Sequence, residues 1–261
     1  MTDAQPRFFW YELMTSDADA AIRFYKDVVG WTADQVVATP EGERYTILAA
    51  GDRSIGGVLQ IGEQMRSHGA RPGWLGYIHV ADTDSAVRGI EEAGGSVHMP
   101  PTDIPNTGRF AMVADPGGVP FYVMTPRPRG DEPPPADPTS LGLVSWRELY
   151  AADGEKAAFA FYSGQFGWET LHEMDMGAMG TYRIFGVGDE QMGGMMDKPP
   201  QAPAPHWNFY FNVDSVDAAV ERVKKAGGQV VMGPIEVPGG SWIIQGVDPQ
   251  GAAFALVSLQ R

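Results

Sequence analysis

Two hydrophobic periods follow one another in the first part of the chain. Residues 8–15, FFWYELMT, have the aromatic content of a strand, and residues 17–30 have the apolar spacing of an amphipathic helix that begins after Asp17 and ends at Gly30. Residues 43–61 predict two or three strands with a hairpin signal at Gly51-Asp52. The pattern therefore predicts a strand, a helix and further strands.

The same order follows in the next part of the chain. Residues 73–81 predict a strand, and residues 83–95 predict a second helix with a glycine stop. Residues 95–126 predict strands around the turn DPGG at 115–118. The pattern up to residue 126 is therefore a doubled βαβββ unit.

This doubled unit then occurs a second time. The segment WYEL at 10–13 returns as WREL at 146–149, and FYKDVVGW at 24–31 returns as FYSGQFGW at 161–168. The matches continue through Tyr45 and Tyr182, Gly56-Gly57 and Gly193-Gly194, Trp74 and Trp207, HVADTDSAV at 79–87 and NVDSVDAAV at 212–220, and DPGGVPFYV at 115–123 and DPQGAAFAL at 248–256. We interpret the glycine pairs, here and at 94–95, 117–118, 227–228 and 239–240, as turns and bulges.

The repeat predicts the domain organisation. Residues 127–140, RPRGDEPPPADPTS, contain five prolines and no apolar period, which is typical of an extended linker. We expect two tandem domains, 1–126 and 141–261, packed on each other. The chain would then act as a pseudo-dimeric monomer or as a homodimer.

The order of these motifs, found twice, resembles the vicinal oxygen chelate superfamily, which includes glyoxalase I, extradiol dioxygenases and fosfomycin- and bleomycin-resistance proteins. The two-domain form is similar to actinobacterial proteins described as glyoxalase-like or hydroxylase-like. The resemblance implies an α+β fold in which tandem βαβββ repeats form two domains with curved half-barrel sheets. It also implies a concave cavity in each repeat or shared between the repeats.

Metal-dependent members of that family hold a divalent ion with His, Gln or Glu side chains from the strands that line the cavity. Neither the first-strand positions nor the final-strand positions carry such a set in this sequence. The matching residues are Trp10 and Trp146 on the first strand, Leu75 and Asn208 at the start of the second half, Tyr122 and Ala255 on the last strand, and Gln60 and Asp197 at the fourth position. Five histidines are present, His68, His79, His98, His172 and His206, and none stands at a ligand position with a second one beside it. A divalent metal would need a divergent site, and we expect no metal and no other cofactor.

Strand alternation predicts which side chains face the cavity. If Trp10 and Trp146 face it, Glu12 and Glu148 do so as well, because alternate residues of a strand share a face. A carboxylate in an aromatic pocket is a candidate catalytic base or a partner for a cationic ligand. The alternative is that each glutamate accepts hydrogen bonds from the backbone or from Arg44, Arg109 or Arg183 and only braces the fold.

The strands that begin at 73 and 206 supply further candidates. His79 could carry a proton, or it could be a packing residue. We expect Tyr77, Tyr122, Asn208 and Tyr210 to contact the ligand together with Trp10 and Trp146. Glu12 is the more promising glutamate on this basis, because repeat two has Ala255 where repeat one has Tyr122. Five methionines between Met174 and Met195 predict an adaptable lining or lid, or simply loop packing.

Composition narrows the function classes. The 261 residues carry 33 acidic and 19 basic side chains, a net charge of −14, which argues against nucleic acid and favours a neutral or cationic ligand. There is no cysteine, so thiolate catalysis and disulfides are excluded, and no signal peptide or membrane-spanning run is apparent, so we expect a cytoplasmic location without membrane contact.

Two functions fit these observations. The first is a glyoxalase- or bleomycin-resistance-like protein that binds an aromatic or cationic small molecule without a metal. The alternative is an enzyme. It could be a glyoxalase-type lyase or isomerase with a divergent metal site, or an enzyme of the dioxygenase type. It could also be a metal-free catalyst in which Glu12 or Glu148 removes a proton from a carbon acid.

Overall fold

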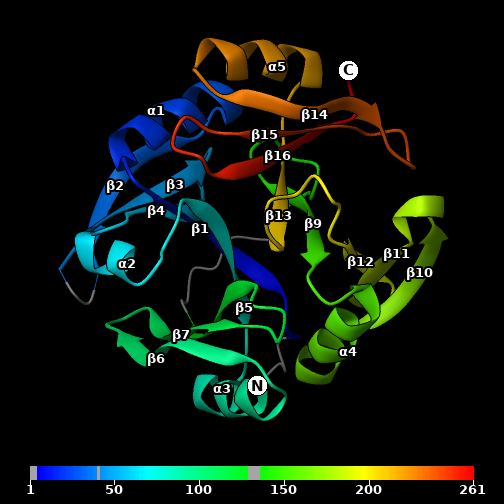
Figure 1. Cartoon of the computed structure of the whole chain (residues 1–261). Coiled ribbons are helices and arrows are strands. Elements are labelled where there is room, and N and C mark those ends of the chain that lie inside the picture. The colour runs from blue at the N-terminus through cyan, green and yellow to red at the C-terminus, as the bar shows by residue number, and fades with distance from the viewer. Residues whose placement is uncertain (1–4, 40–41, 129–135) are drawn as a thin grey trace. The chain divides into compact units, whose positions relative to one another are not determined.

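The computed structural model describes residues 5–39, 42–128 and 136–261 (Figure 1). It confirms the predicted βαβββ order in both repeats. The first repeat contains β1 (Phe8–Thr15), α1 (Ala18–Val29), β2 (Thr32–Ala38), β3 (Arg44–Ala50), β4 (Arg53–Gln60), α2 (Glu63–Ser67), β5 (Gly73–His79), α3 (Thr83–Glu92), β6 (Ser96–Ile104), β7 (Gly108–Ala114) and β8 (Pro120–Pro126).

The second repeat follows the same plan. Its elements are β9 (Val144–Ala151), α4 (Glu155–Phe166), β10 (Glu169–Asp175), the short 3₁₀ helix η1 (Gly177–Met179), β11 (Thr181–Val187), β12 (Glu190–Asp197), β13 (His206–Asn212), α5 (Val216–Lys225), β14 (Gln229–Glu236), β15 (Trp242–Val247) and β16 (Ala253–Ser258). None of the helices in the described part of the chain combines the length and the apolar character needed to span a bilayer.

Each repeat forms one open mixed sheet of eight strands, so the fold is α+β as predicted. The strand orders are β2-β3-β4-β1-β5-β8-β7-β6 and β10-β11-β12-β9-β13-β16-β15-β14. The central pairs β1 with β4 and β5 with β8 are parallel, and the outer pairs are antiparallel hairpins. The parallel pairs place the first and last strands of each βαβββ unit side by side.

Internal contacts divide the chain into two compact units that do not coincide with the repeats. The first unit contains residues 1–10, 75–132 and 146–207, and the second contains 11–74, 133–145 and 208–261. Each unit therefore combines one half of each repeat. The predicted domain division at 127–140 stays a prediction, and residues 129–135 of that linker lie outside the described residues.

Capping explains where the long helices begin and end. The side chain of Asp17 accepts a hydrogen bond of 2.9 Å from Ala20 N, and Gly30 ends α1 with a φ of 89°. The Asp82 side chain likewise accepts from Ser85 N at the start of α3. The helix ends read from the sequence are thus confirmed by the groups that satisfy the free backbone atoms.

The repeated FY, Trp and DP motifs tie each unit together. In the second unit Tyr25 OH donates to Asp248 Oδ2 over 3.2 Å and accepts from Trp74 Nε1 over 2.9 Å. The first unit contains the same arrangement from the opposite repeats, in which Tyr162 bonds to Asp115 and Trp207 over 3.1 and 3.0 Å. The tyrosine and tryptophan come from one repeat and the aspartate from the other, so both repeats are needed to complete each buried set.

The glycine pairs at 56–57 and 193–194 lie within strands and not in turns, and the irregular register beside them agrees with the predicted bulges. They belong to β4 and β12, with a register shift in the ladder beside each pair. A Cβ at Gly56 or Gly193 would overlap the main-chain oxygen of Tyr11 or Arg147 on the neighbouring strand. Glycine is therefore required by close strand approach. At the other four pairs a positive φ at Gly94, Gly118, Gly227 and Gly239 agrees with the predicted turns.

Burial of Asp115 and Asp248 predicts a pH dependence of stability. Desolvation raises the pKa of both carboxyls above the ordinary value of 3.8, so the folded state binds their protons more tightly than the unfolded state does. Their contribution to stability is complete below pH 3.8 and is lost as the pH rises through the raised folded pKa. We expect the stability of the wild type relative to an Asp115→Asn/Asp248→Asn variant to fall across that interval in urea titrations.

Asp82 is the control, because its pKa is shifted in the opposite direction. Hydrogen bonds from Ser85 lower the pKa of Asp82, so its contribution is present above the ordinary pKa and is lost as the pH falls. The difference between the wild type and Asp82→Asn is expected to shrink toward acid. A wild-type stability that rises with pH relative to the Asp115/Asp248 variant would contradict the prediction.

Candidate functional site

A chain of two hydrogen bonds lies at the centre of the candidate site. Trp146 Nε1 donates to Tyr182 OH over 2.8 Å, and Tyr182 OH donates to Glu148 Oε1 over 3.0 Å. Trp146 and Glu148 are alternate residues of β9, so the contacts confirm that they share a face. Burial raises the pKa of Tyr182 well above 10, and the nearby Glu148 charge raises it further, so the hydroxyl is a neutral donor at physiological pH.

Gly194 explains why Tyr182 occupies this place. A Cβ at Gly194 would overlap the end of the Tyr182 ring, so only glycine lets the ring lie against β12. The same relation holds in the other repeat, where a Cβ at Gly57 would overlap the ring of Tyr45. Tyr182 was not among the predicted site residues, although its repetition together with the glycine pair was the signal that could have found it.

Apolar side chains surround this hydrogen-bonded chain. Tyr150, Tyr182 and Met196 are buried, and five partly buried residues pack against them: Trp146, Met174, Met176, Ile184 and Ala202. The ring of His206 stands edge-on to Tyr150 at 5.3 Å. We call these residues, together with Glu148, the Tyr182 cluster. It offers a carboxylate and aromatic rings within one apolar setting, and all of it belongs to the first unit.

The arginines considered as partners of the glutamates bind other carboxylates. Arg183 pairs with Glu155 at 2.7 Å and also with Glu173, and Arg44 pairs with Asp19 at 2.9 Å. Tyr182 is a hydrogen-bond donor to Glu148 that the sequence did not point to. It braces the carboxylate and also fixes the direction in which one oxygen points.

Repeat one presents the same residue types. Glu12 is only 3% exposed and lies opposite Gly57 in the β1–β4 ladder, while Trp10 is its alternate neighbour on β1. Glu12 belongs to the second unit, whereas His79, Tyr77 and Tyr122 belong to the first. The expectation that these three surround Glu12 stays a prediction.

Tyr77 and Tyr122 stack directly on each other. They lie opposite each other in the β5–β8 ladder with ring centroids 4.1 Å apart, and Phe110 extends the stack at 5.9 Å from Tyr122. Phe9 stands edge-on to Tyr77 and to His79, whose ring Nδ1 is buried without a hydrogen-bond partner. Both tyrosines are at most 5% exposed, so much of their ring surface is used within the protein.

Asn208 and Tyr210 lie on β13 in the second unit. Tyr210 pairs with Ala255 on β16, and its hydroxyl accepts a hydrogen bond of 2.8 Å from Gln245 Nε2. Asn208 is 4% exposed. The roles of both residues as ligand contacts, and the role of His79 as a proton carrier, stay predictions.

The residues at the family's metal-ligand positions do not fit a metal. Gln60 and Asp197 were the only donors expected at the fourth position. Both accept a hydrogen bond from the first residue of a helix: Gln60 Oε1 from Ala18 N over 3.3 Å and Asp197 Oδ1 from Glu155 N over 2.8 Å. Within the described ranges no three His, Cys, Asp or Glu side chains gather as a metal-binding group. Tryptophan stands at the first-strand position in both repeats and has no lone pair for a metal.

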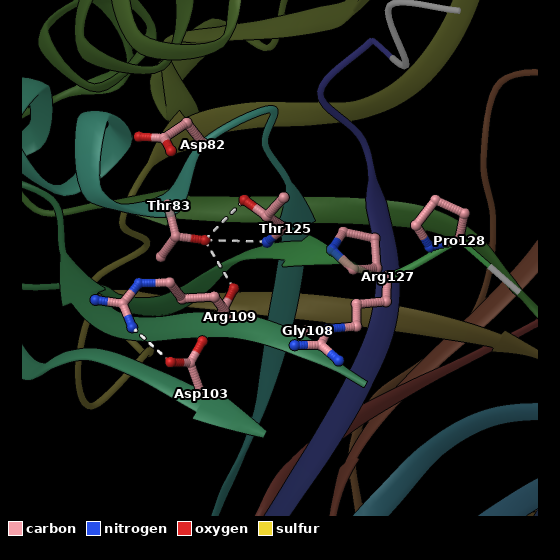
Figure 2. Close-up of a pocket in the computed structure, with 9 residues that line it drawn as sticks. Asp82, Thr83, Asp103, Gly108, Arg109, Thr125, Arg127 and Pro128 are labelled. Atoms are coloured by element: carbon pink, nitrogen blue, oxygen red, sulfur yellow. Dashed lines mark hydrogen bonds and ion pairs between the residues drawn. The ribbon is translucent and has the colours of Figure 1, made fainter. Parts of the chain in front are cut away.

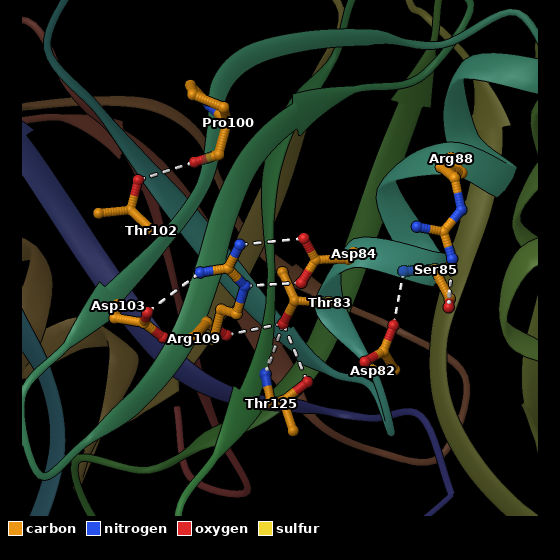
Figure 3. A network of polar contacts seen from close by, with 10 residues as sticks. All are labelled: Asp82, Thr83, Asp84, Ser85, Arg88, Pro100, Thr102, Asp103, Arg109 and Thr125. Atoms are coloured by element: carbon orange, nitrogen blue, oxygen red, sulfur yellow. Dashed lines mark hydrogen bonds and ion pairs between the residues drawn. The ribbon is translucent and has the colours of Figure 1, made fainter.

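A hollow of about 330 Å³ lies beside the start of α3 (Figure 2). Its polar groups satisfy one another: Thr83 Oγ1 donates to Arg109 O over 2.7 Å and accepts from Thr125 N over 3.0 Å. Figure 3 shows Arg109 between Asp84 and Asp103, at 2.6 and 3.2 Å. These bonds hold α3 to β7 and β8, and we assign no ligand to the hollow.

Thr83→Val is expected to destabilise the protein by about 1–3 kcal/mol, because the isosteric side chain leaves Arg109 O and Thr125 N without their partner. Urea denaturation measures the difference. Thr102→Val is the control, since the hydroxyl of Thr102 bonds to Pro100 O at an exposed position. If the two substitutions lower the free energy of unfolding equally, the hydrogen bonds of Thr83 contribute no more to stability than an exposed one.

Comparison with known proteins agrees with this architecture. The model of the Glyoxalase/Bleomycin resistance protein/Dioxygenase superfamily matches residues 7–123 and 146–256. CFP32 of Mycobacterium tuberculosis, provisionally named a glyoxylase, is 32% identical over 248 residues, which cover 95% of this chain and 93% of CFP32. The anthracycline biosynthesis protein DnrV of Streptomyces peucetius is 33% identical over 265 residues, which cover 97% and 93% of the two chains.

Solved structures show the same fold. The Mn(II)-bound glyoxalase of Novosphingobium aromaticivorans superposes with a TM-score of 0.67 at 17% identity, covering 98% of this chain and 82% of that one. The 2,3-dioxygenase LapB of Pseudomonas sp. KL28 gives 0.64 at 14% identity, covering 97% and 91%. With the family model matching both repeats, the chain belongs to the Glyoxalase/Bleomycin resistance protein/Dioxygenase superfamily.

Proposed function

We propose that the protein binds a planar aromatic small molecule that carries an ammonium group, at the Tyr182 cluster and without a metal. The observation that carries the proposal is the hydrogen bond from Tyr182 to Glu148, which holds a carboxylate among aromatic and methionine side chains. Aromatic rings and polarisable methionines suit a flat ring system. A carboxylate in that setting suits a cation or a strong hydrogen-bond donor.

Two further observations support this ligand class. The net charge of −14 attracts cations toward the protein. The relative DnrV is named for anthracycline biosynthesis. The metal-free character is supported by the hydrogen bonds that Gln60 Oε1 and Asp197 Oδ1 accept from backbone N–H groups, because each bond occupies a donor atom that a divergent metal site would use.

The test is a fluorescence titration with 9-(aminomethyl)anthracene and its neutral counterpart 9-anthracenemethanol. Glu148→Gln keeps the volume and the acceptor for Tyr182 but removes the charge. We expect it to weaken binding of the amine about tenfold or more and that of the alcohol about threefold or less, since a hydrogen bond to a charged group contributes about 1.5–3 kcal/mol. The melting temperature is expected to stay equal or to rise, because the substitution removes a buried charge and keeps the acceptor for Tyr182.

Glu169→Gln is the matched control, because it removes one exposed carboxylate from the same unit. It is expected to leave both affinities unchanged. Binding is also expected to persist in EDTA. Absence of saturable binding by the wild type would contradict the proposal. A destabilisation of about 1–3 kcal/mol by Glu148→Gln with binding intact would instead assign Glu148 to the scaffold.

The enzymatic alternative is tested with the same proteins. The buried Glu148 carboxylate, oriented by Tyr182, could also take a proton from a carbon acid. Turnover of the methylglyoxal–glutathione adduct by the wild type, lost in Glu148→Gln, would establish catalysis. Turnover that disappears on chelation would instead establish a metal site and overturn the metal-free proposal.

A further inference from the structure

The two repeats keep the same polar set but surround it with different side chains. Trp, Glu, Tyr and Gly recur at matched positions as residues 10, 12, 45 and 57 and as 146, 148, 182 and 194. By contrast, Tyr150 stands where repeat one has Met14, and Met196 where it has Leu59. The constant part holds a carboxylate, and the variable part forms the wall beside it.

The largest difference lies in the segment before the fifth strand of each repeat. Repeat one has the short helix α2 there, and repeat two has DKPPQAPAP at 197–205, with four prolines and no helix. This proline-rich segment reaches the Tyr182 cluster through Ala202, which packs against the buried residues. At its end the His206 ring meets Tyr150. One wall of the cluster is therefore built by the segment in which the repeats differ most.

Lys198 holds this segment in its folded form. Its Nζ donates to Pro199 O over 3.3 Å and to Ala202 O over 3.0 Å, and its main-chain N donates to Ala151 O over 2.9 Å. Ala202 N also donates to Pro199 O over 3.0 Å. The ammonium group thus joins the end of β12 to the residue that contacts the cluster, and it fixes how closely Ala202 approaches.

We propose that the segment 198–206 determines the size of the aromatic ligand that the Tyr182 cluster accepts, with Ala202 as the limiting side chain and Lys198 as its positioning residue. The inference rests on the proposed function. Because Ala202 packs against the buried residues of the cluster, a larger side chain at this position would occupy space beside them and exclude larger ring systems. The polar set then provides affinity for the ammonium group, and the segment provides discrimination between ring sizes.

Three ammonium ions of increasing ring size test the proposal: benzylamine, 1-naphthylmethylamine and 9-(aminomethyl)anthracene, each titrated calorimetrically. Ala202→Leu is expected to weaken binding of the three-ring amine about tenfold or more relative to its effect on the one-ring amine. Ala204→Leu is the matched control, since Ala204 is an exposed alanine of the same segment. It is expected to leave the ratio of the affinities unchanged.

Lys198→Met keeps the length of the side chain and removes both hydrogen bonds. We expect it to reduce the discrimination between the one-ring and three-ring amines about threefold or more, and Lys198→Arg to restore it, because arginine retains the donors. A purely structural role would lower the melting temperature without changing that ratio. The affinity ratio is therefore the deciding measurement.

The possible failures are distinguishable. If the wild type binds none of the three amines, the proposed function fails and the inference with it. If the wild type binds them and Glu148→Gln abolishes the preference for the ammonium group, but Ala202→Leu and Ala204→Leu leave the same affinity ratio, the site stands and the role of the segment is refuted.

Discussion

Gly193→Ala is expected to destabilise the protein by about 3 kcal/mol or more. The new methyl group would overlap Arg147 O in the ladder between β12 and β9, and this neighbour is backbone. Relieving this overlap requires the two central strands to separate. We expect that separation to cost more than the roughly 1–3 kcal/mol typical of an overpacked side chain. Urea denaturation of both proteins measures the loss, and we expect Gly56→Ala to behave alike because its Cβ would overlap Tyr11 O.

The control for Gly193 has the opposite expected sign. Gly164 lies within α4, where a Cβ would meet nothing within 4 Å. Gly164→Ala is therefore expected to stabilise the protein by about 0.5–1 kcal/mol through helix propensity alone. If Gly193→Ala costs less than 1 kcal/mol, the strands yield easily, and the close approach does not explain the repeated glycine.

Local signals in the sequence predicted the parts of the fold that depend on local chemistry. Asp17 and Gly30 mark the ends of α1 because an aspartate accepts backbone N–H groups and glycine adopts a positive φ. The hairpin at Gly51-Asp52 joins β3 to β4 as expected. The strand β2 was missed because Thr32–Ala38 is an edge strand that is mostly exposed and therefore lacks the alternation that marks a half-buried strand.

The centre of the candidate site depended on a contact between distant residues. Strand parity placed Trp146 and Glu148 on one face, but the hydroxyl that joins them comes from Tyr182 on β11. The space for its ring is created by Gly194 on β12. The recurrence of the tyrosine and the glycine pair in both repeats was visible in the sequence. Their contact with Glu148 became visible only with the three strands β9, β11 and β12 side by side. Sequence reasoning therefore named the carboxylate as a candidate and did not name the residue that orients it.

Each compact unit is built from segments of both repeats, so neither repeat contains a complete unit. A fragment of residues 1–126 expressed alone is expected to lack a stable native fold. In the second unit Trp31 and Trp74 pack against Phe211 at 4.8 and 5.0 Å, and Phe24 packs against Phe254 at 5.5 Å. Removing repeat two exposes these rings and leaves Tyr25 without Asp248.

Mixing the fragment with a second one of residues 136–261 is expected to restore the native state, because each fragment supplies the partners that the other lacks. Near-ultraviolet circular dichroism and tryptophan fluorescence report the burial of Trp31 and Trp168, which are fully buried in the intact chain. Phe211→Ala in the second fragment is expected to weaken the association by removing the ring between Trp31 and Trp74. A monomeric 1–126 fragment with a native near-ultraviolet spectrum would show that the repeat, and not the unit built from both repeats, is the folding domain.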